Sequence, residues 1–281
     1  MAAPALSYCA EQVRRFDNDR FLCNLFAPEP AREGLWPVYA FNIELARIRE
    51  SVSQPLLGHI RLRWWMDALD AIYSGRPPRH EVAIALGRTV DRFGLERQHL
   101  DRIISGRAAD LEDAAPASFD VLIDYADATS AAVSEAALQI LGVAGEETRE
   151  AAREVGIAWA LVGIARAVPF HARSRRIYLP TDMNRLAGLD VFQMFEKGAT
   201  AGVREVVEEV LARAVGYLER ARARRDRVAS GALPVLLPAT LADAYLARLR
   251  RAGFNPFDPE AQGPSALRPI RLLIARWRRR Y

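Results

Sequence analysis

The most regular feature of this sequence is the recurrence of apolar residues at steps of three and four positions. Such spacing places the apolar side chains on one face of an α-helix. The pattern predicts amphipathic helices over 5–16, 34–52, 56–75, 81–94, 97–113 and 119–142. It continues over 147–168, 203–228, 236–251 and 269–278, with short helices around 182–197. No segment shows the strict apolar-polar alternation that is typical of a half-buried strand.

The segment 147–168 differs from the others because its central part, VGIAWALVGIA, carries no charge. A helix that is apolar on most sides is normally buried in the middle of a protein. The clearest stop signal is Ser74-Gly75, which two prolines follow closely. No internal repeat and no low-complexity linker divides the chain. The pattern therefore predicts a single all-α domain over residues 1–281, a large bundle of roughly a dozen helices.

Composition adds little about partners. Apolar residues make up 51% of the chain, which is enough to bury a substantial core. The net charge is only +4, yet the basic side chains are almost all arginine, with Lys197 the single lysine. Planar guanidinium groups suit phosphate and carboxylate partners. The small net charge and the lack of a recognition motif argue against nucleic acid as a partner.

The cysteines and the hydrophobic runs bear on the compartment. Cys9 and Cys23 lie 14 residues apart, which is no metal-ligand spacing, and we expect buried thiols rather than a disulfide. The N-terminus shows no signal-sequence pattern, and no run of about 18 uncharged apolar residues occurs. These features fit a bacterial cytoplasmic protein or a processed organellar one, and the bacterial protein is the simpler interpretation. Any membrane contact is expected to be peripheral, on the inner membrane.

Four short landmarks carry more information than the composition. They are Tyr39-Ala40-Phe41, Arg63-Trp64-Trp65 with Leu69, Tyr125 through Val133 to Leu141-Gly142, and Arg176-Ile177-Tyr178-Leu179-Pro180. In this order and at this spacing, the chain resembles the squalene/phytoene synthase family over roughly residues 8 to 277. The resemblance implies the isoprenoid synthase fold, a single helical bundle around a central cavity. It also implies the head-to-head condensation of two prenyl diphosphates, whose diphosphate charge Mg²⁺ neutralises.

The chain departs from this family at both aspartate-rich metal-binding motifs. The first motif, D-D-x-x-D, falls on Ala46, Arg47 and Glu50, and the second, N-x-x-R-D-x-x-x-D, falls on Gly163, Arg166, Ala167 and His171. One acid survives in the first motif, and only the arginine survives in the second. A single glutamate and a histidine cannot hold a cluster of hard cations. We therefore expect no catalytic residue, no metal ligand and no cofactor.

This double departure itself resembles one branch of the family. AFNIELARIRESVS (40–53), SRRIYLP (174–180) and the closing WRRRY (277–281) look like the branch represented by a mitochondrial respiratory complex I assembly factor. That resemblance implies a catalytically inactive protein whose partner is a complex I subunit or assembly intermediate. It leaves room for an isoprenoid or lipid in the cavity. The alternative is an active synthase that condenses farnesyl or geranylgeranyl diphosphate with Mg²⁺, using acids not yet recognised.

Five residues are candidates for a pocket that binds an anion, namely Tyr39, Arg47, Arg166, Arg176 and Tyr178. Several have a simpler explanation. Tyr178 can end a core helix, and His171 is expected to be neutral and hydrogen-bonded. Arg47 needs an acidic partner if it is buried, such as Glu50 or a carboxylate on a neighbouring helix.

Three further features leave alternatives open. Adjacent Trp64 and Trp65 point about 100° apart on a helix, so at most one faces inward. Asp110 and Asp113 could supply the missing acids, although capping or solvation is the expected role. The arginine-rich helix 203–228 is expected to be a solvated face, because glutamates intersperse its arginines. The closing RWRRRY could equally be solvated or bind anionic lipid or an acidic partner.

Overall fold

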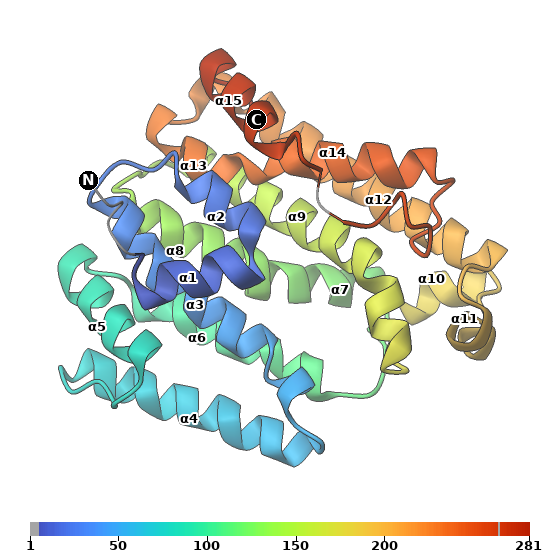
Figure 1. The fold of residues 1–281 in the computed structure, drawn as a ribbon, viewed down its shortest axis with the longest axis horizontal. Helices are drawn as coiled ribbons and strands as arrows, with labels where there is room; N and C mark the ends of the chain where they lie inside the picture. Colours follow the sequence, from blue (N-terminus) through green and yellow to red (C-terminus); the bar gives the residue numbers. More distant parts are fainter. Residues whose placement is uncertain (1–5, 264) are drawn as a thin grey trace.

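The computed structural model describes residues 6–263 and 265–281, and this part of the chain is helical with no strand (Figure 1). The all-α prediction is therefore confirmed. The first helices are α1 (Tyr8–Phe16), α2 (Asn18–Asn24), α3 (Ala31–Ala46), α4 (Pro55–Tyr73), α5 (Glu81–Phe93), α6 (Arg97–Arg107), α7 (Phe119–Ala126) and α8 (Ala132–Ile140). The remaining helices are α9 (Glu146–Arg173), α10 (Thr181–Leu186), α11 (Val191–Lys197), α12 (Ala201–Ala223), α13 (Leu233–Leu236), α14 (Pro238–Arg251) and α15 (Arg268–Arg278).

The long helix α9 runs through the middle of the bundle (Figure 1). It packs against α12 and α14 on one side and against α8 on another. On the other side of the molecule, α3 contacts α1, α5 and α8, and α4 lies at the outer edge against α5 and α6. The buried apolar side chains of these helices form one contiguous cluster. The opposite edge of the molecule carries α15, which rests on α14.

Two helical stretches are long and apolar enough to cross a membrane, namely Glu146–Arg173 and Ser230–Arg251. In this structure, 56% and 72% of their most apolar windows are buried against other helices. An apolar surface on most sides is also what the central helix of a bundle requires. The apolarity of both stretches is thus accounted for by their place in the core.

The ends of several helices differ from the predicted ones. The predicted helix over 34–52 ends at Ala46, and the chain then turns through a short 3₁₀ helix at Arg49–Ser51. The predicted helix over 147–168 continues through Pro169 to Arg173. Proline removes one backbone donor but does not prevent the next turn from forming. This extra turn keeps Phe170 and His171 on the helix, where both line a cavity described below.

Other local predictions are confirmed. Helix α4 ends at Ser74 and Gly75, and Gly75 adopts a φ of +73°, which glycine tolerates without strain. Cys9 and Cys23 are buried free thiols. Trp65 is buried, whereas its neighbour Trp64 is partly exposed. Helix α2 was not predicted from the sequence. It begins at Asn18 and is capped by Asp17, whose carboxylate accepts the backbone N–H of Arg20.

The crossing between α9 and a π-helical turn at Asp127–Ala131, which joins α7 to α8, depends on a glycine. A Cβ added to Gly156 would lie 2.7 Å from the Cα of Ala131, a backbone atom that cannot rotate away. By contrast, a Cβ added to Gly163 on the same helix meets no atom within 4 Å. The close approach at Gly156 lets α9 pack directly on the turn that carries Thr129 and Ser130 into the cavity wall.

We predict that Gly156→Ala lowers the free energy of unfolding by about 1–3 kcal/mol, because the added methyl group overpacks the crossing. Gly163→Ala is the matched control on the same helix, and we expect it to raise the free energy of unfolding by about 0.5–1 kcal/mol. Urea denaturation followed by circular dichroism measures both values. Equal effects of the two substitutions would contradict the tight crossing.

Candidate functional site

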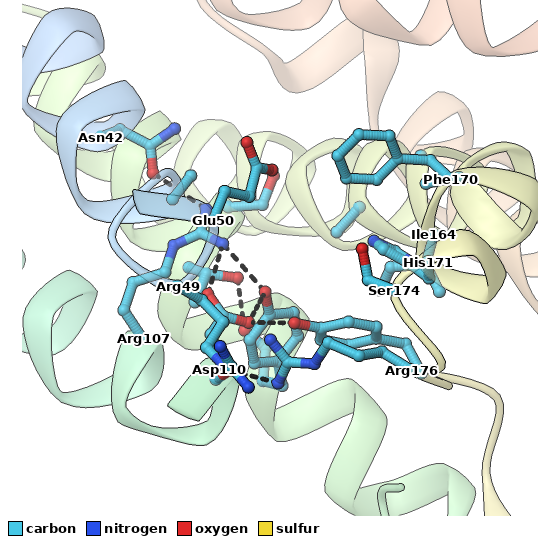
Figure 2. A pocket seen from close by; sticks show the side chains of 18 of the residues that line it. Asn42, Arg49, Glu50, Arg107, Asp110, Ile164, Phe170, His171, Ser174 and Arg176 are labelled. Atoms are coloured by element: carbon cyan, nitrogen blue, oxygen red, sulfur yellow. Dashed lines mark hydrogen bonds and ion pairs between the residues drawn. The ribbon is translucent and has the colours of Figure 1, made fainter. Parts of the chain in front are cut away.

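A cavity of about 460 Å³ opens between the C-terminal ends of α3, α6 and α9. Its volume lies within the range of about 300–1,000 Å³ that small-molecule sites usually occupy. Figure 2 shows the side chains that line it, with a cluster of polar groups on one side and Phe170 on the other. The apolar part of the wall comes mainly from Ala46, Val52, Trp159, Ala160, Ile164, Ala167 and Phe170.

Most of the positions that correspond to the two aspartate-rich motifs lie on this cavity. From α9, Gly163, Ala167 and His171 line it, because residues four apart share one face of a helix. From the end of α3 and the turn after it, Ala46 and Glu50 line it as well. The structure therefore brings five of the seven motif positions together, as the resemblance implied.

The two remaining motif positions and one further candidate lie outside the cavity lining. Arg47 is exposed at the end of α3, and its guanidinium carbon lies 4.0 Å from the centre of the Phe16 ring. Among the described residues it pairs with neither Glu50 nor a carboxylate of a neighbouring helix, and because it is exposed it does not need the acidic partner that a buried arginine would require. Tyr39 is buried in the core, where burial raises the pKa of its phenol.

Arg166 occupies a different face of α9 from the cavity-lining residues. Its guanidinium carbon stacks 3.5 Å from the ring centre of Tyr245 on α14. Burial lowers the pKa of Arg166 despite the opposing influence of Tyr245 and Asp19. Tyr245 in turn donates a hydrogen bond of 2.6 Å to Asp19. Arg166 thus helps to join α9 to α14, and it is not positioned to bind an anion in the cavity.

The polar side of the cavity is organised by Asp110, whose carboxylate is almost fully buried (Figure 2). One carboxylate oxygen accepts the hydroxyl groups of Tyr125 at 2.8 Å and Tyr178 at 3.0 Å. The other oxygen accepts Arg107 at 3.1 Å. Arg107 also donates to Tyr125 at 2.9 Å and to the side chain of Asn42 on α3 at 3.3 Å. The network therefore ties α3, the end of α6, α7 and the loop after α9 together.

The pKa values of the groups in this network keep every hydrogen-bond donor protonated at neutral pH. Burial lowers the pKa of Arg107, but Tyr125 and the Asp110 carboxylate outweigh it and raise the pKa above its ordinary value. Burial raises the pKa of Tyr125 and of Tyr178, and the nearby carboxylate adds to the effect. Arg107 is thus charged and both phenols are protonated at neutral pH. Both oxygens of Asp110 therefore accept hydrogen bonds from groups of the protein itself.

Two other predicted residues complete this side of the cavity. Arg176 donates to the backbone carbonyls of Asp110 and Glu112, the latter at 2.9 Å. The imidazole of His171 lies 4.4 Å from the Tyr178 ring, and burial lowers its pKa to about 4. His171 is therefore neutral at pH 7, as expected. The expected hydrogen bond is not found, since its Nδ1 has no partner within the described chain.

Sequence reasoning missed the role of Asp110, which it treated as a cap or a solvated acid alongside Asp113. The side chain of Asp110 is 7% exposed and that of Asp113 is 81% exposed. One signal was available, because Arg107 and Asp110 are three residues apart at the end of a predicted helix and can pair there. Its partners Tyr125 and Tyr178 already belong to two of the landmarks that carry the family resemblance.

The residues of this cavity do not fit the Mg²⁺ cluster that the family resemblance implies. Only two carboxylates line the cavity, Asp110 and Glu50. Both oxygens of Asp110 are already engaged, and Glu50 stands alone. Mg²⁺ demands near-octahedral oxygen ligands, usually with carboxylates and substrate phosphates among them. Among the described residues, no three His, Cys, Asp or Glu side chains are arranged to hold a metal ion.

The cavity combines a positively charged side with an apolar wall, which suits the binding of an amphiphile. Four arginines line it, namely Arg20, Arg49, Arg107 and Arg176, against the two carboxylates, so its lining carries a formal net charge of 4 − 2 = +2. This positive side faces an apolar wall formed by α9 and the end of α3. A ligand with a polar or anionic head and a hydrocarbon tail would satisfy both sides.

We predict that Asp110→Asn lowers the free energy of unfolding by about 3–5 kcal/mol, because Arg107 would keep a buried charge without its carboxylate. Asp113→Asn is the matched control. Its 3.4 Å pair with Arg49 is exposed on the Asp113 side, so we expect a change of at most about 1 kcal/mol. Chemical denaturation of both variants gives the comparison. A small effect at Asp110 would show that the network does not stabilise the fold.

Comparison with known proteins agrees with this geometry. The profile of the squalene/phytoene synthase family matches residues 13–278. A Bos taurus protein named NADH dehydrogenase (ubiquinone) complex I, assembly factor 6, is 34% identical over 274 residues, which cover 98% of this chain and 82% of that protein. Chloroplastic phytoene synthase 3 of Zea mays is 29% identical over 226 residues, which cover 77% of this chain and 52% of that protein.

The fold comparison points to the same family. A dehydrosqualene synthase solved in complex with a ligand superimposes with a TM-score of 0.83 at 19% sequence identity, covering 97% of this chain and 95% of that one. At such low identity, this likeness establishes the isoprenoid synthase fold alone. Family membership is established by the profile match, since that match spans nearly the whole chain. The chain belongs to the squalene/phytoene synthase family.

Proposed function

We propose that this protein is a catalytically inactive family member that acts in the assembly of respiratory complex I. The observation that carries the proposal is the composition of the cavity wall. The motif positions that face the cavity offer a single carboxylate, Glu50, because Ala46, Gly163, Ala167 and His171 occupy the others. Three protein donors hydrogen-bond to Asp110, the other acid of the wall. The 34% identity to complex I assembly factor 6 over almost the whole chain supports the assembly role.

The loss of prenyl transfer follows from electrostatics. Departure of a diphosphate develops several negative charges at one place, and the barrier falls only if cations are positioned to neutralise them. In this cavity, Arg107 is paired with Asp110, and Arg176 is occupied by two backbone carbonyls. These arginines can attract an anionic head group. Without a metal cluster, however, they do not neutralise the charge of a leaving diphosphate.

Retention of the cavity supports a binding role within the assembly function. We propose an isoprenoid or another lipid as the ligand, with its head toward Arg176 and its tail along Ala167 and Phe170. Such a ligand would stabilise the folded protein in proportion to its occupancy. The partner that receives the protein would be a complex I subunit or an assembly intermediate.

Deletion of the gene in its native host tests this proposal. We expect NADH:quinone activity and assembled complex I to fall, and the unaltered gene to restore both. Glu50→Gln should restore them equally, because the proposed role requires no metal. Ala167→Trp should fail to restore them, because the indole would fill the space beside α9 where a ligand tail lies. Activity and native gel electrophoresis provide the measurements.

The matched control is Ala212→Trp, which places the same side chain on the exposed face of α12. It should restore complex I fully. Intact complex I after gene deletion would refute the assembly role. Full restoration by Ala167→Trp would refute the ligand-bound cavity and leave the assembly role standing.

A further inference from the structure

Helix α15 presents an apolar stripe to the outside of the protein. Ile270, Leu273, Ile274 and Trp277 are all exposed, and Trp277 is 81% exposed. At about 100° per residue, these four side chains fall within roughly 100° of the helix surface. The only two buried positions of the helix, Leu272 and Ala275, lie on the opposite face, against the body of the protein.

Arginines flank this stripe on both sides. On the helix surface, Arg271 and Arg278 lie along one border and Arg276 along the other, and Arg279 and Arg280 follow the helix. None of these five forms an ion pair within the part of the chain that the structure describes. The sequence from 261 to 281 contains no aspartate or glutamate.

The helix is held firmly in this orientation. Arg268, at its start, pairs with Asp19 of α2 and donates to Asn18 at 3.1 Å. Beyond its end, the buried Tyr281 donates its hydroxyl to the carbonyl of Ala221 on α12 at 3.0 Å. These contacts fix the inner face of α15. The outward direction of the apolar stripe is therefore a property of the fold and not of a loose segment.

We propose that α15 is an interfacial helix that docks the protein on an anionic lipid bilayer. An apolar stripe bordered by basic residues is the arrangement by which helices lie in the plane of a membrane surface. The apolar side chains enter the acyl boundary while the arginines reach the phosphate groups beside them. Trp277 suits the interface because tryptophan favours the level of the lipid head groups.

Two other occupants fit the helix less well. A second copy of this chain could cover the stripe, but a symmetric pairing would bring the flanking arginines of the two copies together without acids to neutralise them. An acidic protein would match the charge. It would also need an apolar groove aligned with the stripe, whereas a bilayer offers an apolar layer beneath an anionic surface everywhere.

Vesicle flotation of the full chain tests the proposal. At physiological ionic strength, we expect the protein to float with an equimolar mixture of phosphatidylcholine and phosphatidylglycerol, and not with phosphatidylcholine alone. The triple variant Ile270→Ser, Leu273→Ser and Trp277→Ser should bind the anionic vesicles at least tenfold more weakly. Because all three side chains are exposed, the thermal unfolding midpoint should stay unchanged.

The matched control removes the same kinds of side chain from α4 through Leu56→Ser, Ile60→Ser and Trp64→Ser, which are also exposed. It should leave vesicle binding within twofold of the unaltered protein. A second pair of variants tests whether vesicle binding requires the positive charge of the flanking arginines. Replacing Arg271, Arg276 and Arg278 by glutamine should weaken binding at least tenfold, and replacing them by lysine should preserve it.

Three results would overturn the proposal. The first is failure of the unaltered protein to float with anionic vesicles, which is what recognition of an acidic protein predicts. The second is loss of binding in the α4 control with retention in the α15 variant. The third is binding that needs the arginines but survives removal of the apolar stripe, because that describes surface adsorption without insertion.

Discussion

A single buried carboxylate, Asp110, joins the parts of the chain that enclose the cavity. It accepts hydrogen bonds from Arg107 at the end of α6, from Tyr125 on α7 and from Tyr178 in the loop after α9. Arg107 extends the network to Asn42 on α3. A buried charge is tolerated only when it is paired and fully hydrogen-bonded, so these segments are held in one arrangement. The shape of the cavity depends on that arrangement.

The same interaction decides what chemistry the cavity can perform. Asp110 is committed to Arg107 and two tyrosines, and only one other carboxylate, Glu50, lines the cavity, whereas a cluster of hard cations needs several oxygen ligands. Of the five motif positions that line the cavity, only Glu50 keeps an acid, and Ala46, Ala167 and His171 offer two methyl groups and a neutral imidazole. The polar side of the cavity is thus stabilised by ion pairing and hydrogen bonds among the protein's own side chains. Under the proposed function, the cavity is a binding site whose wall lacks most of the acids of the family's two metal-binding motifs.

Much of the fold could be predicted from the sequence because it rests on local patterns. The three- and four-residue spacing located most of the helices, and Ser74-Gly75 gave the end of α4. Three of the four motif positions on α9, Gly163, Ala167 and His171, line the cavity together, since residues four apart share a helix face. Helix ends were less predictable. The end of α9 was placed before Pro169, whereas packing carries the helix on to Arg173.

The parts that could not be predicted depend on distant contacts. Arg47 and Arg166 belong to the motifs, yet one stacks on Phe16 and the other on Tyr245. Those partners come from other helices, and spacing within one helix does not reveal them. Asp110 looked like an ordinary helix-end acid because its tyrosine partners follow it at 15 and 68 residues. The sequence alone therefore predicted which helix ends line the cavity, but not the hydrogen-bond network that stabilises it.

The most direct test of this account is a turnover measurement. The purified protein is incubated with farnesyl or geranylgeranyl diphosphate and Mg²⁺, and the extract is analysed for C30 and C40 products. Phytoene synthase 3 of Zea mays, assayed in parallel with geranylgeranyl diphosphate, shows that the conditions support catalysis. We expect no product from this protein at any Mg²⁺ concentration, because the part of the chain that the structure describes holds no carboxylate cluster. Steady formation of a head-to-head product would contradict the account.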